Sequence, residues 1–133
     1  MLISLFRGFV TIVFSVLYRV KIIGKENMPE NGALILCANH NGEMDMFFIG
    51  YRIKRLVHYM AKEELFRNPL FGRFFRWLGA FPVKRGKADV EAIKTSLKLL
   101  EQNEVLGIFP EGTRMKKKAT NSVRAKPGIA LIA

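Results

Sequence analysis

The chain has 133 residues, half of them hydrophobic, and a formal net charge of +11 at pH 7. This composition excludes a disordered polar chain, and the length fits one domain with a real hydrophobic core. The positive charge predicts an anionic partner or surface, for which nucleic acid and anionic lipid both qualify. The single cysteine, Cys37, excludes a disulfide framework and a cysteine metal site, and it favours a reduced, cytosol-facing setting.

Residues 1–20 are almost entirely apolar and are interrupted mainly by Arg7 and Arg19. A membrane-spanning helix needs about 20 apolar residues, and the uninterrupted run from Gly8 to Tyr18 is too short. No small-residue cleavage site of the signal-peptide type follows this run. We therefore expect a membrane-associating helix that inserts shallowly, with a buried core helix as the alternative.

The next segments predict a strand that leads to a polar loop. Residues 21–24 fit a short edge strand, and a turn-rich stretch then leads to the apolar run 33–38, which predicts a buried strand. His40 follows at the carboxyl end of that strand. Residues 46–49 look like the start of a helix, which places Asp45 near a helix amino terminus, where negative charge is favoured.

Strands and helices alternate through the rest of the chain. Further strands are expected at 56–60, 79–83 and 105–109. Asn68 as a cap and Pro69 at the first helical position predict a helix to about Leu78, and Asp89 caps a helix with apolar residues at helical spacing. This alternation predicts an α/β fold with a mostly parallel sheet flanked by helices, whose ligands gather beyond the carboxyl ends of the strands.

His40 and Asp45 have the spacing of a general base and the carboxylate that orients it. An imidazole that takes a proton from a hydroxyl needs a fixed tautomer, which a carboxylate on the other ring nitrogen supplies. Two side chains five residues apart on one helix point to different sides, so Asn41 and Gly42 must turn the chain between them. Taken alone, the pair fits a cap and a turn residue better than a catalytic site.

Four motifs in a fixed order favour a catalytic interpretation of this pair. They are His40 with Asp45, Phe81-Pro82-Val83-Lys84-Arg85-Gly86, Phe109-Pro110-Glu111-Gly112-Thr113-Arg114, and Lys126-Pro127-Gly128. With these motifs the chain resembles the 1-acylglycerol-3-phosphate O-acyltransferase family of the glycerolipid acyltransferases. The resemblance covers nearly the whole sequence, and the third motif is the most specific.

The resemblance implies a glycerol-3-phosphate acyltransferase-like fold, with a membrane-associating helix at 1–20 and an acyltransferase domain at 21–133. It implies transfer of a fatty acyl group from acyl-CoA or acyl carrier protein to the free hydroxyl of 1-acylglycerol 3-phosphate, which forms phosphatidic acid for phospholipid biosynthesis. The enzyme would work at the cytoplasmic face of a membrane, without a metal or cofactor and without nucleic acid as a partner. His40 would be the general base and Asp45 its orienter.

The second and third motifs would hold the phosphorylated acceptor. The implied substrate-binding residues are Lys84, Arg85, Glu111, Gly112, Thr113 and Arg114. The arginines and the lysine suit a phosphate, Glu111 orients an arginine or accepts an acceptor hydroxyl, and Thr113 donates to the phosphate or to an oxyanion. Gly112 lets the backbone approach closely. An acyl thioester is already activated, and strand alternation turns Cys37 away from His40, so we expect no acyl-enzyme.

Two residues depart from the family pattern, which often has serine at the positions of Gly42 and Met115. Family members usually continue for several tens of residues, so we expect the C-terminal part of the domain to be missing. The motifs leave open glycerol 3-phosphate or another lysolipid as the acceptor. A non-catalytic basic module that binds anionic membrane or nucleic acid is the alternative class. The aromatic and arginine-rich stretch 65–78 fits either a membrane interface or a core helix with a basic face.

Overall fold

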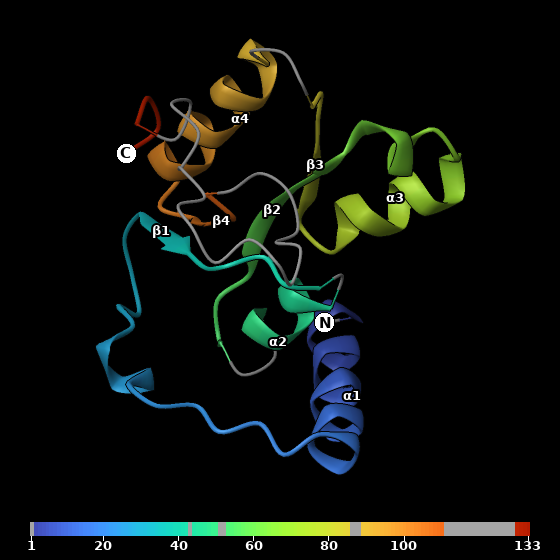
Figure 1. The fold of residues 1–133 in the computed structure, drawn as a ribbon, viewed down its shortest axis with the longest axis vertical. Helices are drawn as coiled ribbons and strands as arrows, with labels where there is room; N and C mark the ends of the chain where they lie inside the picture. Colours follow the sequence, from blue (N-terminus) through green and yellow to red (C-terminus); the bar gives the residue numbers. More distant parts are fainter. Residues whose placement is uncertain (1, 43, 51–52, 86–88, 111–129) are drawn as a thin grey trace.

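Four parallel strands form one sheet in this computed structural model, which describes residues 2–42, 44–50, 53–85, 89–110 and 130–133 (Figure 1). The strands are β1 (Leu34–Cys37), β2 (Val57–Lys62), β3 (Ala80–Val83) and β4 (Val105–Ile108). Their spatial order is β1-β4-β2-β3, with every neighbouring pair parallel. The predicted parallel α/β sheet is thus confirmed, and the last strand in the sequence lies inside it.

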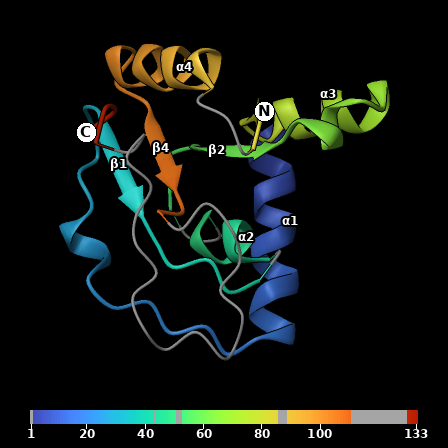
Figure 2. The same ribbon diagram turned by 45° about the horizontal axis from the view of Figure 1, so that its top comes forward.

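The helices are α1 (Leu2–Leu17), α2 (Asp45–Gly50), α3 (Pro69–Trp77) and α4 (Val90–Glu101), and short 3-10 turns occupy Lys25–Asn27 and Glu63–Phe66. The two predicted caps are confirmed. The Asn68 side chain accepts hydrogen bonds from the Leu70 and Phe71 N–H groups, and the Asp89 side chain accepts one from Ala92. Figure 2 shows α4 on one side of the sheet and α1 and α2 on the other.

The core consists of two apolar clusters, one on each face of the sheet. Phe81, Leu106 and Ile108 pack with Ala92 of α4 on one face. Val57, Tyr59 and Val105 pack on the other, where Met46 and Ile49 of α2 cover them. Because β4 contributes to both clusters, all four of its residues are buried.

Two predictions for the first strands are wrong. Residues 21–24 form no strand: the chain turns at Gly24, whose φ of 78° is left-handed, and enters the 3-10 turn. The strand at 33–38 is only partly buried, and Cys37 is exposed. The reason is that β1 lies at an edge of the described sheet and has one strand neighbour, β4.

Helix α1 confirms the helix expected at the amino end of the chain. Phe14 is its buried residue, while a stripe of apolar residues at helical spacing stays exposed: Leu2, Leu5, Phe9, Ile12 and Val16, each at least 64% exposed. Among the described residues, no helix has both the length and the apolar character needed to cross a bilayer. The helix therefore has a face that packs on the domain and an apolar face that the described residues leave uncovered.

Candidate active site

His40 lies where β1 meets β4. Beyond the end of β1, the Ala38 N–H still donates to the Ile108 carbonyl at 3.1 Å, so the chain follows β4 to the carboxyl edge of the sheet before it turns away. His40 therefore reaches the edge at which ligands of parallel sheets bind. Phe109, the first residue of the third motif, leaves β4 at the same place.

A single oxygen of Asp45 organises the loop between β1 and α2. Asp45 Oδ2 lies 3.0 Å from His40 Nδ1, and it also accepts hydrogen bonds from the N–H groups of Asn41 at 2.6 Å and Gly42 at 2.8 Å. The predicted turn at these two residues is confirmed, since it brings the side chains of His40 and Asp45 together. The two side chains are only 12% and 20% exposed.

The charge of Asp45 sets the tautomer of His40. Partial burial raises the pKa of Asp45, but the hydrogen bonds from Gly42, His40 and Asn41 together lower it below its ordinary value. The carboxylate is thus ionised at neutral pH and accepts a hydrogen bond from the Nδ1–H group. The lone pair of the neutral imidazole then resides on Nε2, which is the arrangement of a general base.

A stack of three rings supports the imidazole. The His40 ring lies 4.4 Å from the Phe109 ring at 24°, and Phe109 in turn stacks on Tyr59 at 5.9 Å and 16°. The Tyr59 ring has room because Gly107 of β4 has no side chain: a β-carbon at that position would lie 2.2 Å from the ring. Sequence reasoning did not assign these aromatic residues to the site, although Phe109 opens the third motif.

The structure places Lys84 and Arg85 farther away. Both are exposed in the loop after β3, at the same edge of the sheet as His40. However, β4 and β2 lie between β1 and β3, so three strand spacings, roughly 14 Å, separate the two sites. The Lys84 ammonium lies 4.0 Å from Glu63, and its backbone N–H donates to Asp89. The described structure does not bring these two cations to His40.

The remaining predicted residues, Glu111, Gly112, Thr113 and Arg114, lie outside the described residues, and so does Met115. The position of Gly42, where the family often has serine, is not sterically restricted. A β-carbon there would lie 3.7 Å from Asp45 Oδ1, an ordinary contact. Within the described part of the chain, no three His, Cys, Asp or Glu side chains gather in a way that could hold a metal ion.

Comparisons with known proteins identify the family of the chain. The model of the acyltransferase family matches residues 19–133. A 1-acyl-sn-glycerol-3-phosphate acyltransferase of Bacillus subtilis (strain 168) is 38% identical over 123 residues, which are 92% of this chain and 60% of that protein. Proteins of the same name are 37% identical in Streptococcus pneumoniae, over 80% of this chain and 38% of theirs, and 35% identical in Saccharomyces cerevisiae, over 71% and 32%.

No solved structure gives a significant match. The chain spans about 60% of the length of the Bacillus subtilis relative and less of the other two. The family match nevertheless covers both the His40 and Asp45 pair and the third motif. Its matches to the family model and to these relatives show that the chain belongs to the acyltransferase family.

Proposed function

We propose that this protein transfers a fatty acyl group from acyl-CoA or acyl carrier protein to the free hydroxyl of 1-acylglycerol 3-phosphate, forming phosphatidic acid. The observation that carries the proposal is the hydrogen bond between His40 Nδ1 and ionised Asp45, which leaves Nε2 to act as the base. Three relatives are 1-acyl-sn-glycerol-3-phosphate acyltransferases, which supports 1-acylglycerol 3-phosphate as the acceptor.

The reaction needs one proton carrier and no acyl-enzyme. His40 Nε2 takes the proton of the acceptor hydroxyl as its oxygen attacks the thioester carbonyl carbon. The carbon–sulfur bond then breaks, and the imidazolium returns the proton to the leaving thiolate. Asp45 stabilises the transient positive charge on the imidazole, and the Phe109 ring fixes the plane of the imidazole.

The acceptor phosphate is proposed to bind the basic residues of the second and third motifs. Arg114 belongs to the third motif, which follows β4 in the sequence, and we propose it as the main ligand of the acceptor phosphate. Arg85 and Lys84, three strand spacings from β1, are proposed to attract the anionic donor or headgroup from a greater distance. Glu111, Gly112 and Thr113 are proposed to line the same acceptor site.

The role of His40 is tested by replacing it with alanine in the full-length protein. The thiol-release rate with a long-chain acyl-CoA and 1-acylglycerol 3-phosphate should fall by about 100-fold to 10,000-fold, the usual effect of removing a general base. The control is His58→Gln, because His58 hydrogen-bonds the Gly79 carbonyl away from the pair. Turnover of His40→Ala at the wild-type rate would refute the proposed role.

The acceptor is tested with a panel of glycerol 3-phosphate, other lysolipids and a phosphate-free monoacylglycerol. Arg114→Ala should slow turnover of phosphorylated acceptors and leave the phosphate-free one nearly unaffected. An equal loss for both kinds of acceptor would contradict phosphate binding by Arg114. The acyl donor is identified by comparing acyl-CoA with acyl carrier protein in the same assay.

We also propose that the protein works on a membrane surface, at its cytoplasmic face. The apolar stripe of α1 is exposed, and α3 exposes Leu70 and Phe71 beside several arginines, Arg67, Arg73 and Arg76. Apolar side chains that enter the acyl boundary next to cations at the headgroup level are typical of interfacial helices. Such a surface would give the site direct access to a lipid acceptor.

A further inference from the structure

Helix α2 carries Asp45 but is too short to be stable alone. It has six residues, and isolated helices of fewer than about 12 residues are marginal in water. None of its residues is fully buried. Its position, and with it the position of the Asp45 carboxylate, must therefore come from the elements that pack against it.

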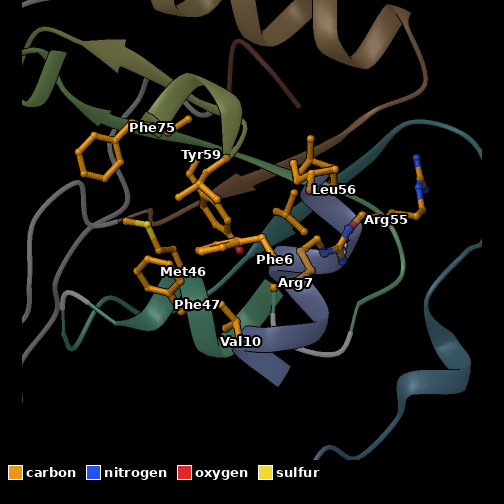
Figure 3. A pocket seen from close by; sticks show the side chains of 14 residues that line it. Phe6, Arg7, Val10, Met46, Phe47, Arg55, Leu56, Tyr59 and Phe75 are labelled. Carbon is orange, nitrogen blue, oxygen red and sulfur yellow. Dashed lines mark hydrogen bonds between the residues drawn. The ribbon is translucent and has the colours of Figure 1, made fainter. Parts of the chain in front are cut away.

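The inward face of α1 supplies part of this packing. Phe14, the buried residue of α1, contacts two rings of α2: Phe48 edge-on at 5.1 Å and Phe47 stacked at 6.5 Å. Near the other end of α1, Phe6 and Val10 share a cavity of about 80 Å³ with α2 residues (Figure 3). Helix α1 thus packs against α2 through these side chains.

Arg7 connects α1 to the segment between α2 and β2. Its guanidinium donates hydrogen bonds to three successive backbone carbonyls, those of Ile53, Lys54 at 3.1 Å and Arg55 at 3.2 Å. These residues lie between α2 and β2, and Figure 3 shows Arg7 reaching from α1 toward this segment. Burial lowers the pKa of Arg7, yet the group stays charged at neutral pH. Arg7 interrupts the apolar run in the sequence, and these hydrogen bonds anchor α1 to the rest of the domain.

We propose that Arg7 is a positioning residue for the catalytic pair. By fixing α1 to the carbonyls that follow α2, it lets Phe14 hold α2 so that Asp45 meets His40 Nδ1. The inference rests on the proposed function, because it assigns Arg7 a role through the base of that reaction. It makes α1 part of the catalytic apparatus in addition to any role at the membrane.

The test compares two arginines of the same segment in the full-length protein. Arg7→Met removes the three hydrogen bonds, whereas Arg19→Met removes the same charge from an exposed position just after α1. We expect Arg7→Met to lower kcat about 10-fold to 100-fold at unchanged KM for the acyl donor, as for a displaced catalytic group. Arg19→Met should keep the wild-type kcat, and Arg7→Lys should restore part of the loss.

A second readout does not depend on turnover. The proton between His40 Nδ1 and Asp45 should give a low-field NMR signal, which Arg7→Met should shift or abolish and Arg19→Met should preserve. If Arg7→Met fails to fold, Phe14→Leu replaces it: this variant keeps Arg7 but loses the ring contacts to α2. Its control is Ile23→Ala, since Ile23 is 83% exposed.

The outcomes separate the two proposals. If His40→Ala abolishes turnover but Arg7→Met and Phe14→Leu match their controls in both kcat and the NMR signal, the positioning role is wrong and the proposed reaction stands. If His40→Ala turns over at the wild-type rate, the proposed reaction with His40 as the base is wrong. In that case the NMR signal alone decides whether Arg7 positions the pair.

Discussion

At the scale of residues, the Asp45 carboxylate links the loop geometry to the state of the imidazole. One of its oxygens accepts hydrogen bonds from the Asn41 and Gly42 backbones and from His40. These hydrogen bonds favour the ionised carboxylate, and they also hold its oxygen in place opposite the Nδ1–H group of the imidazole. Chemistry and local folding therefore depend on the same few atoms.

Asp45→Asn should lower kcat by about 100-fold to 10,000-fold while KM changes little, because an amide can present its N–H to Nδ1 and so stabilise the wrong tautomer. The measurement is steady-state thiol release with saturating acceptor. Asn41→Ala is the control, since the backbone N–H of residue 41 remains. A kcat within about twofold of wild type would show that the tautomer is fixed by another group.

The same residue predicts a pH dependence of stability. The pKa of Asp45 is lower in the folded chain than in the unfolded chain, so its stabilisation is complete above the unfolded value of about 3.9 and is lost as the pH falls through the folded value. The difference in unfolding free energy between wild type and Asp45→Asn should therefore shrink as the pH drops below about 4. Urea denaturation at a series of pH values measures it, and a difference that grows toward acid would contradict the assignment.

Tyr59 offers a second prediction at this scale. Its hydroxyl is buried without a hydrogen-bond partner among the described residues, and burial raises its pKa. An unsatisfied buried hydroxyl costs about 1 kcal/mol or more, so Tyr59→Phe should stabilise the fold by about 1 kcal/mol and keep the ring stack. Urea denaturation, with the exposed Tyr18→Phe as control, tests this. A clear destabilisation would mean that the hydroxyl has a partner.

At the scale of elements, local signals located the helices α3 and α4, whereas the strand predicted at 21–24 does not form. Asn68 with Pro69 and Asp89 fix helix starts through their own side chains, so the sequence alone located α3 and α4. The segment at 21–24 has the residues of a strand but forms none, because Gly24 turns the chain and no neighbouring strand pairs with it. Strand formation depends on a partner strand that is distant in the sequence, and the local hydrophobic pattern gives no information about that partner.

The Tyr59 ring of β2 occupies the space beside Gly107 of β4, where a side chain would otherwise lie. Gly107→Ala would force a methyl group into the Tyr59 ring and should destabilise the protein by about 1–3 kcal/mol. The matched control is Gly8→Ala, where nothing lies within 4 Å of the added β-carbon and helix propensity favours alanine by about 1 kcal/mol. Thermal or urea unfolding should move the two variants in opposite directions. Equal effects would show that Tyr59 yields to the methyl group at little cost.

At the scale of the whole molecule, the apolar stripe of α1 and the net charge of +11 predict binding to anionic vesicles. Ile12→Glu places a charge in the stripe and should weaken binding to phosphatidylglycerol vesicles about 10-fold or more, because a glutamate must leave water to insert. Sedimentation with vesicles measures it, and neutral phosphatidylcholine vesicles show the electrostatic part. Unchanged binding would place the membrane contact elsewhere on the protein.

The sequence also predicted that His40 and Asp45 meet, because they are close along the chain and a local turn joins them. It could not predict which distant groups surround the pair. Lys84 and Arg85 lie in the second motif, yet the strand order places them three strand spacings away from β1. Phe109 contacts His40 only because β4 pairs directly with β1. These relations are properties of the sheet topology.

The strand order also has a consequence for how the protein is made. During synthesis β1, β2 and β3 leave the ribosome before β4, yet β4 lies between β1 and β2. Until it inserts, β1 lacks its strand neighbour, and both faces of the core lack their central residues. Pairings of such long sequence separation form slowly. Phe109 arrives with β4, so the step that completes the core also brings this ring to His40, and an incompletely folded chain has no assembled site.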